Sequence, residues 1–172
     1  LEKYEEALLY IEEYKKYLSK CDLPIIADEG ILKALPRTNE ARVDDIREEK
    51  YTKILLKKLI YGNKKIQLLA DTKDNLDALA ESLTNYRSDL NIVSKIAMDS
   101  LENSTERMLN HVNDIVPDVI ISKMESLGQL SLMEDSRAMM NCKLWIGLPE
   151  NMVILQDKES IFAKVWNMLF HR

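Results

Sequence analysis

The chain has 172 residues, of which 46% are hydrophobic and 31% are charged, and its formal net charge is −5 at pH 7. This negative charge disfavours nucleic acid as the main partner, because nucleic-acid-binding domains are typically basic. Only four glycines and four prolines are present. A scarcity of turn-forming residues combined with many charges is typical of long helices with solvated faces.

The first two segments are predicted to be a helix and a connector. Residues 1–21 form an amphipathic pattern, and residues 22–37 contain Pro24 and Pro36, which are unfavourable inside a helix. One stripe of the predicted helix is made of Leu1, Tyr4, Leu8, Ile11 and Leu18.

The segment 38–116 is predicted to be one very long helix. Gly62 is the only helix-breaking residue within it. Five polar residues at 71–75 interrupt the apolar pattern, so a hairpin that turns there is the alternative. A continuous helix is favoured because no glycine or proline forces a turn. At about 1.5 Å per residue, such a helix would be a rod of about 120 Å.

The centre of this segment carries apolar residues at spacings of three and four. That spacing is typical of a coiled-coil seam, along which helices of different subunits meet. We therefore predict a partner-binding seam for other helical subunits of a hetero-oligomer. Its residues are Leu76, Leu79, Leu83, Tyr86, Leu90, Val93 and Ala97.

A basic stripe precedes the seam. At about 100° per residue, four lysines fall within an arc of about 60° on a helix. The stripe predicts a docking surface for an acidic protein, and a solvated helix face is the alternative. Its residues are Lys50, Lys53, Lys57 and Lys64.

Two further helices are expected near the C-terminus. Residues 117–146 are predicted to form a helix after a kink at Pro117, and residues 147–172 an apolar helix after a proline-containing stop. The last helix is apolar on nearly every side, so it needs a surface that buries it. We predict that it anchors the chain to a partner through Ile161, Phe162, Val165, Trp166, Leu169 and Phe170.

No catalytic, metal or cofactor site is expected. Asp44, Asp45 and Glu48 would place carboxylates on one helix, as a magnesium site requires. A chain with 29 acidic residues produces such a group easily by chance. His111 and His171 have no neighbouring residue at metal-ligand spacing.

The cysteine content and hydropathy bear on the compartment. Cys21 and Cys142 lie far apart in the sequence and are expected to be reduced. No apolar run reaches 18 residues, so no membrane-spanning segment is expected. These observations favour an intracellular location, cytoplasmic or nuclear.

Together the patterns predict an all-α, extended, coiled-coil architecture with short N- and C-terminal helices. The predicted function is that of a non-catalytic structural subunit, which spaces and docks the partners of a heteromeric coiled-coil complex. Cytoskeletal, chromosome-segregation and tethering complexes contain scaffolds of this kind. Two alternatives stay open. One is a compact helical-bundle binding or regulatory module, and the other is a helical metal-dependent enzyme.

Overall fold

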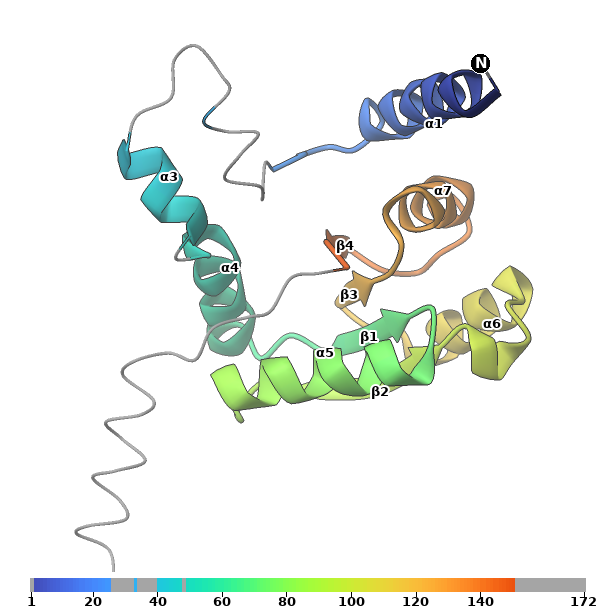
Figure 1. Cartoon of the computed structure of the whole chain (residues 1–172). Coiled ribbons are helices and arrows are strands. Elements are labelled where there is room, and N and C mark those ends of the chain that lie inside the picture. Colours follow the sequence, from blue (N-terminus) through green and yellow to red (C-terminus); the bar gives the residue numbers. More distant parts are fainter. Residues whose placement is uncertain (1, 26–32, 34–39, 48, 151–172) are drawn as a thin grey trace, which may run out of the picture.

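A parallel β-sheet with helices on both faces forms the centre of the protein (Figure 1). The computed structural model describes residues 2–25, 33, 40–47 and 49–150. The four strands lie in the order β2-β1-β3-β4, and every neighbouring pair is parallel. Their bounds are β1 Ile66–Ala70, β2 Ile92–Ala97, β3 Val119–Lys123 and β4 Leu144–Leu148.

Helices connect the strands in the way that parallel pairing requires. The helices α5, α6 and α7 join β1 to β2, β2 to β3 and β3 to β4. The chain moves outward from β1 to β2 and then returns past β1 to β3, so the sheet is doubly wound. The helical bounds are α1 Glu2–Leu18, α3 Glu40–Arg47, α4 Lys50–Tyr61, α5 Lys73–Tyr86, α6 Thr105–Ile115, α7 Ser126–Ser136 and the 3-10 turn η1 Asp99–Leu101.

The two central strands are buried on both faces. All five residues of β1 are buried, as are the first four of β3. Strands of this kind appear in a sequence as short, nearly continuous apolar runs, because neither side meets water. The runs at 66–70 and 119–121 have this character.

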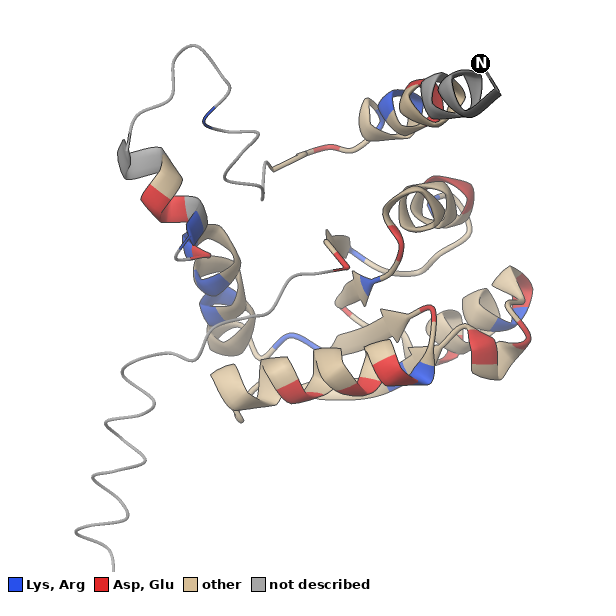
Figure 2. Ribbon diagram, viewed as in Figure 1, with Lys and Arg blue, Asp and Glu red and all other residues tan. Residues whose placement is uncertain are grey.

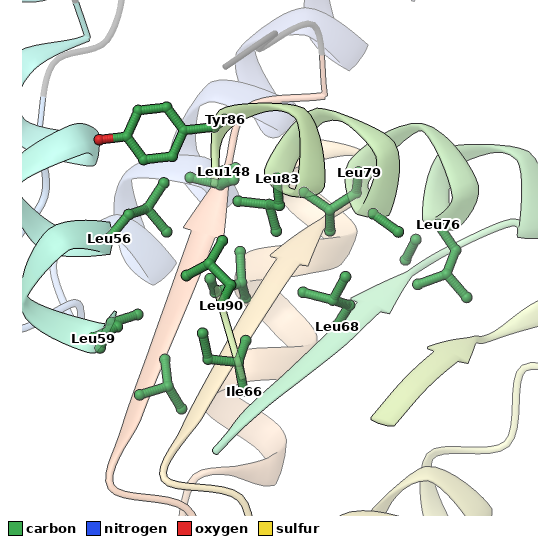
Figure 3. Packing of buried hydrophobic residues seen from close by; sticks show 14 of the residues in the cluster. Leu56, Leu59, Ile66, Leu68, Leu76, Leu79, Leu83, Tyr86, Leu90 and Leu148 are labelled. Carbon is green, nitrogen blue, oxygen red and sulfur yellow. The ribbon is translucent and has the colours of Figure 1, made fainter. Parts of the chain in front are cut away.

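One face of the sheet packs against α4 and α5 (Figure 3). Ile66 and Leu68 of β1 lie beneath Leu79 and Leu83 of α5. Leu56 of α4 belongs to the same cluster, together with Leu59, Leu76, Tyr86, Leu90 and Leu148. The helix that precedes the first strand therefore completes the cover on this side.

The opposite face packs against α6 and α7. Leu69 of β1 and Ile120 of β3 contact a cluster that includes Met108 and Val112 of α6. Leu132 of α7 packs against the edge of that cluster. The sheet is thus the middle of three layers, with α4 and α5 on one side and α6 and α7 on the other.

The predicted all-α, extended coiled-coil architecture is wrong, and so is the predicted role as a structural subunit of a heteromeric coiled-coil complex, because the chain forms an α/β domain around a parallel sheet. Segment 38–116 is not one helix, because it contains α3, α4, β1, α5, β2, η1 and α6. Gly62 ends α4, but the left-handed positions of the turns are taken by other residues: Asn63, Glu102 and Asn103 adopt positive φ values of 44°, 55° and 54°. Asparagine tolerates this left-handed region better than most residues. Counting only glycine and proline therefore missed the turns, and the rod of about 120 Å that the uninterrupted spacing implied does not form.

The predicted seam is split between a helix, a loop and a strand. Its first four residues are buried on α5, where they face the sheet of the same chain. Leu90 lies in the following loop, and Ala97 is buried on β2. Val93 is 39% exposed on β2, an edge strand. Spacings of three and four were a helical signal only as far as Tyr86.

The terminal segments are only partly described. Helix α1 lies inside the predicted range 1–21, while 22–25 and 33 are the only described parts of the connector. Between 117 and 146 the chain forms β3, α7 and the start of β4 instead of one helix. The predicted C-terminal anchor, residues 161–170, lies outside the described residues.

Candidate functional site

The edge formed by the carboxyl ends of the strands is the position where a fold of this kind places a binding site. Doubly wound sheets bind ligands in the crevice where the strand order reverses, which here lies between β1 and β3. Ala70 of β1 is in register with Lys123 of β3 on one side and Ala97 of β2 on the other. Asp71 and Asp99 follow these strand ends, so both approach the same edge as Lys123.

The N-terminus of α5 is occupied by side chains of the chain itself. The Thr72 hydroxyl accepts a hydrogen bond from the Asn75 amide at 3.2 Å. The Asp71 carboxylate accepts from the Thr72 amide and from the Asn75 side chain, both at 2.7 Å. The Asp99 carboxylate accepts from the Lys73 amide at 3.2 Å. The amides of Lys73 and Asn75, two of those that could attract an anion at this helix start, are therefore already bonded.

The N-terminus of α7 is closed in the same way. The Glu125 carboxylate accepts from the Gly128 amide at 2.7 Å and from the Leu127 amide at 3.0 Å. The Tyr10 hydroxyl of α1 also donates to it, at 2.9 Å. The amides of Gly128 and Leu127, followed by the Tyr10 hydroxyl, hold the pKa of Glu125 below its ordinary value. Both helix starts beside the switch point thus carry an internal anion.

We expect Glu125→Gln to destabilise the protein at neutral pH but not in acid. The pKa of Glu125 is lowered on folding, so its contribution is complete above its ordinary pKa of about 4.3 and disappears as the pH falls through the lower folded-state value. Loss of the cap charge should cost about 0.5–1 kcal/mol at pH 7. Urea unfolding of both proteins at several pH values measures this difference. An equal difference at pH 7 and at pH 3 would contradict the assigned role of the carboxylate.

The strand on the other side of β1 from β2, which is β3, supplies a cation at this edge. In the described part of the chain, no group of three or more His, Cys, Asp or Glu side chains could hold a metal ion. Asp71 and Asp99 are two carboxylates, while β3 places Lys123 at the same edge. Like charges repel, so an ammonium group at this position opposes a divalent cation.

A buried polar network joins α7 to the ends of β3 and β4. The Ser122 hydroxyl donates to Gln129 Oε1 at 2.8 Å and accepts from Trp145 Nε1 at 2.8 Å. Gln129 Nε2 donates to the carbonyl of Leu148 at 3.3 Å. A Cβ at Gly147 would lie 2.7 Å from Gln129 Nε2, so the close approach of this amide requires glycine there. The network therefore fixes α7 to the carboxyl ends of β3 and β4 beside the switch point.

The remaining predicted residues lie elsewhere. Three lysines of the basic stripe are on α4, and Lys64 is in the turn after it. Asp44 pairs with Arg47 and Asp45 with Lys50, each at 2.7 Å. Glu48, the third member of the predicted carboxylate group, lies outside the described residues, as does His171. The other predicted histidine is in α6, where Nε2 of His111 lies 2.9 Å from the Ser94 hydroxyl.

The two cysteines and the hydropathy are the observations on which the expected compartment depends. Cys21 and Cys142 are both half-buried free thiols, and burial raises the pKa of each. No helix within 2–25, 33, 40–47 and 49–150 combines the length and the apolar character needed to cross a bilayer.

The sequence analysis did not predict that Asp71, Asp99 and Glu125 lie at one edge of a sheet, because it did not predict the strands. A signal was present: the apolar run 66–70 is followed at once by Asp71 and Thr72, and the run 119–121 is followed four residues later by Glu125. Capping residues directly after short apolar runs are typical of strand-to-helix connections.

No protein-family model matches the chain, and no curated protein matches it either. The strand order β2-β1-β3-β4 coincides with the first four positions of the flavodoxin-like order 2-1-3-4-5. This likeness concerns the fold alone, because one fold supports many functions. A functional conclusion therefore has to come from the side chains and backbone amides at the carboxyl edge of the sheet.

Proposed function

We propose that this chain is a non-catalytic α/β binding domain that acts through contacts of its outer surface with proteins. One observation carries the proposal: the helix starts on both sides of the switch point are capped by the carboxylates of Asp71, Asp99 and Glu125. In this role the sheet is a rigid support, and the exposed helices are the parts that meet a partner.

The capping carboxylates occupy the positions where doubly wound domains commonly bind phosphate-bearing ligands. Phosphate groups of cofactors are held by free amides at a helix start, usually after a glycine-rich loop. Here the loop between β1 and α5 consists of Asp71 and Thr72. A phosphate would have to displace the carboxylates and would also be repelled by them. An external anion therefore gains little at this edge.

The proposal includes a compartment and a class of partner. Half-buried cysteines without a disulfide support a reducing, intracellular environment. The net charge of −5 favours protein over nucleic acid as the partner. The lysines of α4 form a positive surface that could bind an acidic surface of a partner protein.

We expect phosphate-bearing ligands and Mg²⁺ to leave the thermal stability unchanged. A ligand at 100 times its Kd would stabilise the protein by about 2.7 kcal/mol, which raises Tm by several degrees. Differential scanning calorimetry with 10 mM phosphate, pyrophosphate, Mg²⁺, FMN or Mg·ATP should show shifts below about 1 °C. Lys123→Ala is the control, because Lys123 is a cation at the end of β3, beside the switch point. A saturable rise in Tm that disappears in Lys123→Ala would overturn the proposal.

A further inference from the structure

The outward side of α4 is basic and partly apolar. Residues 50–65 contain six lysines and no acidic residue, although the whole chain has a net charge of −5. The side of α4 opposite its buried leucines carries large exposed side chains at spacings of three and four. These are Tyr51 (52% exposed), Ile54 (47%), Lys58 and Tyr61 (91%).

The outward side of α5 is acidic. Asp74, Asp77 and Glu81 are exposed, and their spacings of three and four place them opposite Leu79 and Leu83. Among the described residues, no ion pair engages these three carboxylates. Figure 2 shows the contrast, with acidic residues along α5 and basic residues on α4.

The two helices are neighbours on one face of the sheet. Leu56 and Leu59 of α4 share a buried cluster with Leu83 and Tyr86 of α5. Because both helices bury one side in that cluster, both turn the other side away from the sheet. One face of the molecule therefore presents a positive helix beside a negative one, and such a face is complementary to a copy of itself.

We propose that the domain pairs with a second copy of itself, with α4 of each copy against α5 of the other. The inference rests on the proposed function and names its partner. A two-fold arrangement brings the same patch of both copies together, so each contact occurs twice. The two helices have 12 and 14 residues, which makes them about 18 and 21 Å long, so they can cover one another along nearly their full lengths.

The side chains suit such a contact chemically. Lys58 and Lys64 place ammonium groups opposite Asp77 and Glu81, which reduces the repulsion within each helix. Tyrosine combines a large ring with a hydroxyl donor, so Tyr51 and Tyr61 can pack on α5 and donate to its carboxylates. Ile54 has the exposed Ala78 available as a small apolar neighbour. A second copy is preferred over an unrelated acidic protein because this chain itself carries both halves of the contact.

Charge reversal provides the test. Lys53→Glu/Lys57→Glu/Lys58→Glu changes the charge of α4 from +4 to −2 and so makes both helices acidic, whereas Asp77→Lys/Glu81→Lys changes the charge of α5 from −2 to +2 and makes both basic. We expect the wild-type chain to be a dimer by light scattering during size-exclusion chromatography, and each reversed variant to be a monomer. An equimolar mixture of the two variants should again contain dimers, because each acidic helix meets a basic one. Glu106→Lys/Asp114→Lys on α6 reverses as many charges as the α5 variant does, but on the other face, and should leave the dimer intact.

A reversed variant that remains a dimer overturns the inference. A wild-type monomer at 1 mM, or a mixture of reversed variants that stays monomeric while both remain folded by circular dichroism, overturns the inference. If a reversed variant fails to fold, Tyr61→Ala decides instead, because its 91% exposed side chain contributes little to folding. It should weaken dimerisation at least tenfold, and an unchanged Kd overturns the inference. A wild-type monomer that binds a poly-glutamate peptide would exclude the second copy but leave the proposed function standing, whereas phosphate binding at the sheet edge would overturn the proposed function.

Discussion

Replacement of Leu83 by alanine should lower the free energy of unfolding by about 3–4 kcal/mol. Leu83 is fully buried between α5 and the sheet, in the cluster that also holds Leu68 and Leu79. The substitution removes apolar contacts and leaves a cavity that a packed three-layer core closes only partly. Equilibrium unfolding in urea, followed by circular dichroism, measures the change.

Val93→Thr is the matched control for this prediction. Leu83 and Val93 would occupy equivalent seam positions in a coiled coil, whereas the structure places Val93 on an edge strand with 39% of its surface exposed. A threonine of similar shape suits an exposed strand position, so the expected cost is below about 0.5 kcal/mol. Similar large losses from both substitutions would contradict the fold and favour a shared helical seam.

Replacement of Ser122 by alanine should lower the free energy of unfolding by about 2–3 kcal/mol. The substitution removes one hydroxyl but leaves two groups without their bond, Nε1 of Trp145 and Oε1 of Gln129. Ser122 is fully buried and Gln129 is 6% exposed, so water does not readily replace the lost contacts. The measured quantity is again the free energy of unfolding in urea.

A double-mutant cycle separates the network from simple loss of volume. Gln129→Met keeps the size of the side chain and removes its amide, so Ser122→Ala should cost less in that background. We expect the two effects to differ from additivity by about 1 kcal/mol, as for residues that share hydrogen bonds. Additive effects would show that Ser122 and Gln129 do not act together.

The buried positions of α5 could be predicted from the sequence, but their partner could not. Leu76, Leu79, Leu83 and Tyr86 do form one apolar side of a helix. The spacing says only that this side is buried, and a sheet of the same chain covers it as well as another helix would. The runs at 66–70 and 119–121 gave too little information, because a short apolar run has no period that distinguishes a strand from a buried helix.

The candidate site depends on contacts that are distant in the sequence. Thr72 caps α5 from within three residues, and such local caps can be read from a sequence. Asp99 reaches the Lys73 amide across 26 positions, and Tyr10 reaches Glu125 across 115. The strand order brings Asp99 beside Lys73, and the packing of α1 against α7 brings Tyr10 to Glu125. Without the strands, no sequence pattern could place these groups at one edge.

The closed edge of the sheet is the central claim, and the backbone amides that close it can be observed directly. The amide resonances of Thr72, Lys73, Leu127 and Gly128 should be followed by ¹H–¹⁵N NMR while inorganic phosphate and Mg·ATP are added. Because these amides are bonded to Asp71, Asp99 and Glu125, we predict that their positions stay unchanged. Saturable shifts confined to these amides would show that the edge binds phosphate and would contradict the account.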